Sequence, residues 1–515
     1  MHTSTQNHWS WLADKVSWWI PSVDATATDT TALFVGVAVF VTVSWFCIRR
    51  ADLPPGPRSW PLVGCLPSLL FYSGAIHEIF HKLSQRYGPV VSVDLIFGRR
   101  VVVLHGFDVI RDAFHQYPEL NGRPSLSVFE KVLKGGVGVV GATGDLWKTQ
   151  RRITLNFMRD FGLNKPVFED RITTETQHML EEMRKHGGQP FNPSHLLSSA
   201  IANVICSVVY GSRYEYSDPR FVELLRAVYR NLELMGGATG AILFMPYSHL
   251  LASLVPMVRE CLDNMQYVCD FSQDVLEHHR KDFDRNNLRD FMDVIIKETT
   301  SSKTNVTIND LHGTTADLFA AGTETSSTTL QWALLAMIVH PEVQGQVQEE
   351  LDRVVGRDRL PKLSDRHRLP YTEATLQEIQ RIGNIIPLGV PHEASSDVTF
   401  RQYHIAKGTL VLPNLWALGM DPELWPEPQS FKPERFLDET GQNVLKPDEL
   451  IPFCTGRRAC VGEQLAKMEL FLFFTHLLHQ FILQKPEGSP PLSFRGVGGI
   501  SLAPQPFEIC AVPRR

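Results

Sequence analysis

The 515-residue chain lacks a cysteine framework, an excess of basic charge and an internal linker, and each absence removes a class of protein. Its eight cysteines are widely scattered, which excludes the disulfide scaffold of a small secreted domain and favours a reduced, cytosol-facing domain. The net charge of −6 argues against a general nucleic-acid binder. Past residue 50 no long Gly/Ser tract, charge block or repeat divides the chain, so we expect one large domain that binds no nucleic acid.

One apolar run near the N-terminus carries targeting information. Residues 31–48 contain no charge and approach the ~20 residues that a spanning helix needs. Arg49 and Arg50 follow, and positive charge marks the cytosolic side of a membrane segment. A cleaved signal peptide is the alternative, but its charge would precede the apolar run. The sequence therefore predicts an N-terminal segment (1–50) with a membrane anchor at about 31–48 and a cytosolic catalytic domain behind it.

The remaining chain predicts a mainly α domain with a small β region. Prolines 54, 55 and 57 fix φ and predict a stiff extended linker over 51–60, ahead of a domain spanning 61–515. Two β-branched runs, 90–95 and 101–104, predict paired strands around Gly98. Long apolar-periodic segments predict helices at 221–234, 311–340, 342–355 and 462–481. Gly313, followed by two threonines, predicts a less regular start to the second of these helices.

The most informative motif presents one cysteine in a Gly-bounded turn beside arginines, with Phe453, Gly456, Arg458, Cys460 and Gly462 at its fixed positions. One thiolate cannot build a structural zinc or iron–sulfur site, but it suffices as the axial ligand of a haem iron. The glycines let backbone approach the sulfur, and N–H groups and nearby arginine favour the deprotonated thiol. The alternative is that Cys460 is a small apolar residue at a turn.

The spacing Phe-x-x-Gly-x-Arg-x-Cys-x-Gly resembles the haem-ligand signature of the cytochromes P450, the haem-thiolate monooxygenases. The likeness extends from Pro54 to Pro504 and is closest to the animal microsomal group. Residues 413–416 and 463–471 resemble the branch that oxidises long-chain fatty acids. The resemblance implies the P450 fold behind a transmembrane helix, haem b, O2 as cosubstrate, and electrons from NADPH through a diflavin reductase, with cytochrome b5 as a further donor. It also implies an endoplasmic reticulum membrane location, membrane lipid contacts and a lipophilic substrate.

An acid and an alcohol stand side by side in the expected helix 311–340. Threonine in a helix can donate to the carbonyl one turn earlier, and a hydroxyl that holds a water beside a carboxylate is a plausible proton relay. The resemblance gives Thr325 the hydroxyl role and Glu324 the acid role in oxygen activation. The alternative is a polar helix face against a buried water.

The resemblance assigns further residues to holding the haem. Glu378 and Arg381, at i and i+3, are implied to join Arg435 in an ion-pair network that serves folding and haem retention. The implied partners of the haem propionates are Trp147 and Arg151, at i and i+4, together with Arg123, His392 and Arg458. The implied reductase-docking face consists of basic residues near the cysteine: Lys148, Arg151, Arg152, Arg159, Arg457 and Lys467.

Four apolar segments resemble the substrate-contacting regions of the family: 126–129, 319–321, 386–390 and 500–502. They fit a lipophilic ligand, and a long-chain fatty acid is the substrate that the branch resemblance implies. Three alternatives remain open: a broad xenobiotic or steroid hydroxylase, a haem-thiolate isomerase of lipid peroxides, and a non-catalytic haem or lipid binder.

Overall fold

The computed structural model describes residues 35–37, 39, 52–60, 62–125, 132, 136–161, 166–236, 240, 242–243, 250, 254–300 and 306–514. Most of the predicted anchor (31–48) lies outside these ranges, as does the predicted substrate segment 126–129. Among the described residues, no helix combines the length and the hydropathy needed to cross a bilayer.

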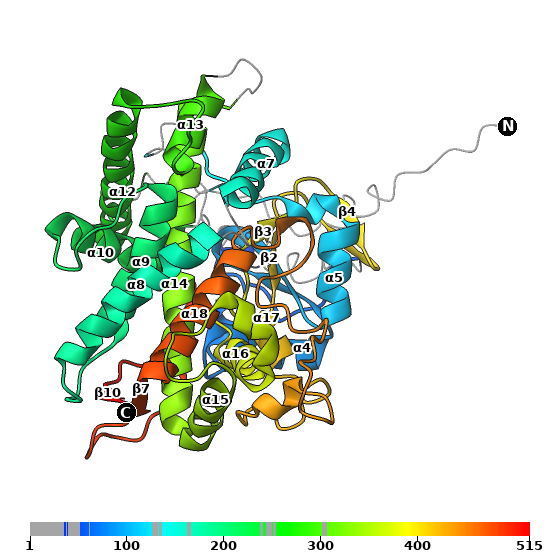
Figure 1. Ribbon diagram of the computed structural model, residues 1–515. Helices are drawn as coiled ribbons and strands as arrows, with labels where there is room; N and C mark the ends of the chain where they lie inside the picture. The colour runs from blue at the N-terminus through cyan, green and yellow to red at the C-terminus, as the bar shows by residue number, and fades with distance from the viewer. Residues whose placement is uncertain are drawn as a thin grey trace, which may run out of the picture.

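The described chain is mainly helical, with a small sheet region, as the sequence predicts (Figure 1). The α-helices are α3 (Leu66–Leu69), α4 (Ile76–Tyr87), α5 (Phe107–Gln116), α7 (Gly144–Phe161), α8 (Pro166–Lys185), α9 (Ser194–Val209), α10 (Pro219–Leu234), α12 (Pro256–Lys281), α13 (Phe291–Thr299), α14 (Ile308–Val339), α15 (Pro341–Val354), α16 (Pro370–Gly383), α17 (Leu415–Gly419) and α18 (Glu463–Gln480). Short 3₁₀ turns are η2 (Ile96–Gly98), η3 (Pro118–Asn121), η5 (Leu363–Arg368), η6 (Pro433–Phe436) and η7 (Gly456–Arg458). The four predicted helices correspond to α10, α14, α15 and α18.

The main sheet has four strands in the order β1-β2-β6-β3. Its strands are β1 (Val90–Asp94), β2 (Arg100–Leu104), β3 (His392–Glu393) and β6 (Leu410–Pro413); the two-stranded pairs are β4 (Val398–Phe400) with β5 (Tyr403–Ile405), β7 (Phe481–Gln484) with β10 (Cys510–Pro513), and β8 (Gly496–Gly498) with β9 (Leu502–Pro504). β1 and β2 pair antiparallel with Val90 opposite Leu104, which confirms the predicted pairing. β2 and β6 run parallel, so they need the long connection that the helices provide.

The proline segment is extended and lies against the edge of β1. Ser92 donates to the carbonyl of Pro55 through its backbone N–H, at 2.8 Å, and to that of Pro54 through its hydroxyl, also at 2.8 Å. A Cβ on Gly56 would lie 1.8 Å from the Ser92 carbonyl oxygen. The predicted linker is therefore docked on the sheet, and only glycine allows so close an approach.

The long helix α14 runs through the helical part of the molecule, with α9 and α18 packed on it (Figure 1). It begins at a capping box in which Thr307 accepts from the Asp310 N–H and Asp310 accepts from the Thr307 N–H. The predicted irregularity at Gly313 is wrong, because α14 is an α-helix through that residue. Gly313 instead permits close packing, since a Cβ there would lie 2.7 Å from the backbone nitrogen of Gly138.

Candidate functional site

Cys460 lies in a tight turn between η7 and the start of α18, and its side chain is exposed. Its N–H donates to the carbonyl of Phe453 at 3.1 Å, which joins the first residue of the motif to the cysteine. Gly456 has φ +80°, and a Cβ there would lie 2.6 Å from the Phe114 carbonyl oxygen. The motif's glycine is thus required by both the left-handed backbone and the close contact.

The sulfur of Cys460 accepts from backbone N–H groups at the N-terminus of α18. Although Cys460 is exposed at the surface, the atoms packed around its turn partly desolvate the sulfur, and this raises the pKa of the thiol. The N–H groups of Gly462 and Glu463 and the charge of Arg151 act in the opposite direction and stabilise the thiolate. The geometry presents one sulfur at an exposed position with donors behind it, which is the arrangement an axial metal ligand needs.

Three arginines gather beside this turn and donate only to backbone carbonyls. Arg458 donates to the carbonyls of Asn121, Val139 and Ala142; Arg123 donates to those of Val140, Val390 and Pro391; Arg151 donates to that of Ala459 at 2.8 Å. None of the three has a carboxylate partner within the described ranges. Carbonyl oxygens satisfy the N–H groups but leave the positive charges uncompensated.

The lowered pKa values of these guanidinium groups reflect the same uncompensated positive charge. Burial lowers the pKa of Arg123 to about 10 and that of Arg458 to about 9. The charge of Arg151 lowers both further, and Arg123 adds to the effect on Arg458, so the three residues repel one another. A partly buried cluster of like charges without an acidic partner in the described chain calls for an anion. The two propionates of a haem held by Cys460 fit this donor set.

Trp147 and His392 lie in the same cluster. The Arg458 guanidinium lies 4.1 Å from the Trp147 ring centroid, and that of Arg151 lies 5.9 Å from it. His392 belongs to β3, stacks on Phe114 with centroids 4.1 Å apart, and places Nδ1 3.0 Å from the Leu120 carbonyl oxygen. Burial lowers the pKa of His392 well below its usual value, and the charges of Arg123 and Arg458 add to this. The ring is therefore neutral at pH 7 in this arrangement.

Thr325 and Glu324 lie on α14, but their side chains make different contacts. The Thr325 hydroxyl donates to the carbonyl of Ala321 at 2.6 Å, as expected for threonine inside a helix. The Glu324 carboxylate accepts at Oε1 from Thr328, at 3.0 Å, and from Ser501, at 2.6 Å. Burial raises the pKa of Glu324, whereas these two hydroxyl groups lower it. Both residues are described by the structure, and their side chains form no hydrogen bond with each other.

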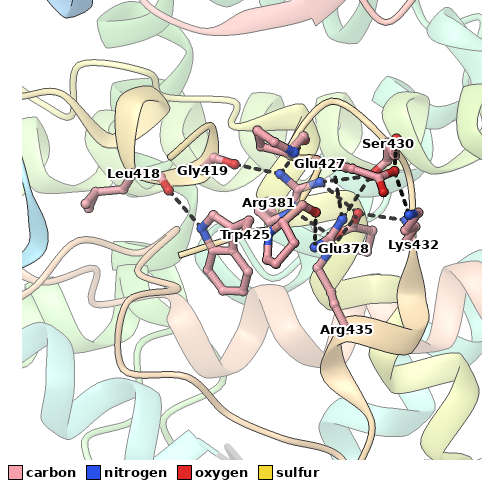
Figure 2. Close-up of polar contacts among 11 residues, drawn as sticks. Glu378, Arg381, Leu418, Gly419, Trp425, Glu427, Ser430, Lys432 and Arg435 are labelled. Carbon is pink, nitrogen blue, oxygen red and sulfur yellow. Dashed lines mark hydrogen bonds and ion pairs between the residues drawn. The ribbon is translucent and has the colours of Figure 1, made fainter. Parts of the chain in front are cut away.

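Glu378, Arg381 and Arg435 interlock as the resemblance implies (Figure 2). Glu378 binds Arg381 through two bonds of 2.6 and 2.7 Å and accepts from Nε of Arg435 at 3.2 Å. The remaining N–H groups of Arg381 donate to the carbonyls of Gly419, Pro428 and Ser430. The Glu378 and Arg381 side chains are fully buried. The network thus joins α16 to the meander that precedes η6.

The basic surface near Cys460 is smaller than the sequence suggests. Four of the six residues have partners: Lys148 pairs with Asp145, Arg159 with Asp160, Lys467 with Glu463, and Arg151 with the Ala459 carbonyl. Arg152 and Arg457 are exposed and make no ion pair within the described part of the chain. Of these six residues, Arg152 and Arg457 therefore keep exposed cations without an ion pair in the described chain.

Two carboxyl groups, the partly buried Asp317 and the buried Glu469, were not assigned a role from the sequence. Asp317, two turns before Thr325 on α14, accepts from the N–H of Val140 at 2.8 Å, and burial raises its pKa to about 7. Glu469 on α18 accepts at Oε2 from Ser326 at 2.6 Å, and burial raises its pKa to about 8. An acid within a strongly apolar helix was the available signal in both cases.

The predicted substrate segments differ in burial. Phe319 is fully buried, whereas Ala321 is exposed on α14. Val390 is 38% exposed, whereas Ser501 and Leu502, in the hairpin of β8 and β9, are buried. The three described segments therefore contribute only some of their side chains to an accessible apolar surface.

Comparison with known proteins gives one consistent result. The family model described as "Cytochrome P450" matches residues 54–511. The chain is 38% identical over 512 residues to cytochrome P450 2U1 of Rattus norvegicus, covering 95% of this chain and 96% of that protein. It is 39% identical over 495 residues to cytochrome P450 2J3 of Rattus norvegicus (95% and 97% covered) and 39% identical over 475 residues to cytochrome P450 2C16 of Oryctolagus cuniculus (90% and 95% covered).

Proposed function

Because the chain belongs to the cytochrome P450 family, we propose that it hydroxylates long-chain fatty acids, using electrons from NADPH delivered by a diflavin reductase. Membership makes the chain a monooxygenase that uses haem b, O2 and electrons from a redox partner. The observation that carries the haem assignment is the cluster of Arg123, Arg151 and Arg458, which has no acidic partner in the described chain and lies beside a thiol with two N–H donors.

The proposal gives each site residue a task. Cys460 would supply the thiolate that holds the haem iron, and the turn from Phe453 to Gly462 positions its sulfur. Arg123, Arg151 and Arg458 bind the propionates, with Trp147 packed against two of them. The neutral His392 lies among these cations and can accept a proton when a carboxylate binds next to it, because an adjacent negative charge raises a histidine pKa.

The thiolate-ligated haem supplies the activation of O2, and this chain supplies positioning, proton delivery and water exclusion. Thr325 can turn its hydroxyl from the Ala321 carbonyl toward a bound water. Glu324 keeps Oε1 engaged by two hydroxyl groups, and burial raises the pKa of its carboxyl group, which favours the protonated form of the acid. The pair therefore supports a route for protons along one side of α14.

The fatty-acid assignment is supported by the branch resemblance at residues 413–416 and 463–471 and by the apolar surfaces at Ala321 and Val390. The test is a reconstitution of holoprotein, reductase and NADPH with a panel of long-chain fatty acids and steroids. Hydroxylated fatty acid formed in proportion to NADPH consumed supports the proposal. Turnover of steroids alone supports the broad hydroxylase, NADPH-independent rearrangement of a lipid hydroperoxide supports the isomerase, and a bound lipid without turnover supports the non-catalytic binder.

Reductase docking is assigned to the face that carries Arg152 and Arg457. Exposed unpaired cations accelerate the encounter with an acidic partner in a salt-dependent way. Charge reversal by Arg152→Glu should slow reduction of the haem by reductase at low salt and leave reduction by dithionite unchanged. The paired Lys148 provides the matched control, and equal rates for Arg152→Glu and wild type would refute the docking face. Cytochrome b5 is proposed to use the same face.

The endoplasmic reticulum membrane is the proposed location, with the catalytic domain on the cytosolic side and the segment 31–48 as single-pass anchor. Apolar side chains are exposed next to the docked proline segment: Trp60 (45%), Leu62 (70%), Leu70 (84%) and Phe71 (90%). Such a group is costly in water and favours contact with membrane lipid. Reduced vesicle binding of a Leu70→Ser/Phe71→Ser variant that lacks residues 1–50 would support this contact.

A further inference from the structure

The hairpin formed by β8 and β9 places one serine on the carboxylate of α14. Gly498 pairs with Leu502, so residues 499–501 form the tip of the hairpin. The hydroxyl of Ser501 donates to Oε1 of Glu324 at 2.6 Å. Ser501 is 8% exposed and Glu324 is 4% exposed, so the contact lies largely out of water.

The position of Ser501 is fixed by backbone contacts on both sides. The N–H of Ile500 donates to the carbonyl of Leu232 on α10 at 3.3 Å. The N–H of Leu502 donates to the carbonyl of Ile385, just after α16, at 2.8 Å. The serine is therefore held between two helical elements, and its hydroxyl is presented to Glu324 without movement of the hairpin.

The two oxygens of the Glu324 carboxyl group have different surroundings. Thr328 and Ser501 both donate to Oε1. Oε2 makes no hydrogen bond within the described chain. Because Oε1 accepts two hydrogen bonds, a proton bound by this carboxyl group belongs on Oε2.

The groups around this carboxyl are neutral. Besides the two hydroxyl groups, the titratable side chain that faces it is Tyr229 of α10, whose hydroxyl lies 2.5 Å from that of Ser327. Burial and the Glu324 charge raise the pKa of Tyr229, so the phenol stays protonated at neutral pH. No cation pairs with Glu324 within the described part of the chain. Hydroxyl groups, rather than ion pairs, therefore decide the orientation of the carboxyl.

We propose that Ser501 is a positioning residue for proton delivery: it holds Oε1 of Glu324 so that Oε2 carries the transferable proton. The inference rests on the proposed function of Glu324. It also revises the expectation for segment 500–502, since Ser501 serves the acid on α14 rather than contacting substrate. Without the serine hydroxyl, the carboxyl group can rotate and exchange its two oxygens, and the proton is presented in two directions.

The direct test is infrared titration of the Glu324 carboxyl in ferric holoprotein, with the protonated C=O band assigned by its loss in Glu324→Gln. In Ser501→Ala the band should persist to higher pH, by up to about one unit, because a hydrogen bond that stabilises the carboxylate is removed. Ser501→Thr keeps a hydroxyl and should titrate as wild type. Ser493→Ala, which removes an exposed hydroxyl from the same C-terminal segment, is the matched control. An unshifted band in Ser501→Ala would overturn the proposal.

Coupling and binding measurements separate positioning from substrate contact. Ser501→Ala should lower product formed per NADPH severalfold while the spectral Kd of the substrate stays unchanged. Adding Ser501→Ala to Glu324→Gln should cause no further loss. A changed Kd with wild-type coupling, or additive losses in the double variant, would refute the role of Ser501 alone. Wild-type coupling in Glu324→Gln would instead refute the proposed role of Glu324, and with it this inference.

Discussion

Oε2 of Glu469 accepts a hydrogen bond of 2.6 Å from the hydroxyl of Ser326, and this contact joins the helix that follows Cys460 to the helix that carries Thr325. Both groups are buried, and the other carboxyl oxygen, Oε1 of Glu469, has no partner in the described chain. Burial raises the pKa of Glu469 to about 8, so the carboxyl is mostly neutral at pH 7. This neutral polar contact between α18 and α14 therefore helps to fix the helix that follows Cys460 against the helix that carries Thr325.

The Glu378 network should stabilise the fold strongly. Glu378→Gln leaves Arg381 and Arg435 without their carboxylate, and breaking a buried pair costs ~3–5 kcal/mol in the free energy of unfolding. The exposed pair of Glu427 and Lys432, close by in the same network (Figure 2), provides the control, because surface pairs contribute less than ~1 kcal/mol. Guanidinium unfolding of both variants measures the difference. Equal destabilisation by Glu378→Gln and Glu427→Gln would contradict this account.

Arg151 should retain haem through its charge. Within the described chain its one hydrogen bond is to the Ala459 carbonyl, so Arg151→Met should remove little structure while it removes the proposed propionate partner. A charge-assisted hydrogen bond contributes ~1.5–3 kcal/mol, which corresponds to haem loss that is roughly 10- to 100-fold faster. Transfer of haem to excess apomyoglobin measures the rate. The neighbouring exposed Arg152→Met should lose haem as wild type does, and an equal effect of both substitutions would exclude the propionate role.

Thr325 should determine how much of the NADPH consumed leads to product and how much to hydrogen peroxide. Thr325→Ala removes the hydroxyl that can hold a water, so proton delivery weakens and electrons escape as hydrogen peroxide. We expect the product formed per NADPH to fall about tenfold. This is less than the loss of a complete general acid would cause, because a water molecule can partly take over the role of the hydroxyl. Thr329→Ala is the control, since its hydroxyl donates one turn further on to the Thr325 carbonyl. Unchanged peroxide release in Thr325→Ala would rule out the relay.

Asp317 should make stability depend on pH in a defined direction. Its folded-state pKa of about 7 lies above the ordinary value of about 4, so the folded protein binds the proton more tightly than the unfolded chain. This contribution is fully present below pH ~4 and is lost as pH rises through 7. Asp317→Asn, which can still accept from Val140, should therefore gain stability relative to wild type as pH rises from 5 to 8. Denaturant midpoints across this range test it, and a constant difference would contradict it.

The sequence predicted the mainly helical fold, because the long apolar helices are local patterns, and the residues that the resemblance assigns to the haem propionates lie close to one another in the structure. Contacts across the chain could not be predicted in the same way. The bond from Ser501 to Glu324 joins residues 177 positions apart and depends on how the β8–β9 hairpin packs. A count of basic residues also does not show which of them form ion pairs, because this depends on side-chain rotamers. The structure pairs Lys148 with Asp145 and Lys467 with Glu463. The regular course of α14 through Gly313 followed from packing against Gly138, which overrides the low helix propensity of glycine.

Cys460 is proposed to supply the thiolate ligand of the haem. The reduced, carbon-monoxide-bound difference spectrum of purified holoprotein tests it, beside Cys460→Ala and the neighbouring Cys454→Ala. We expect a Soret band shifted far to the red in wild type and in Cys454→Ala, and its loss in Cys460→Ala. A histidine-type spectrum in wild type, or a red-shifted band that survives in Cys460→Ala, would contradict it.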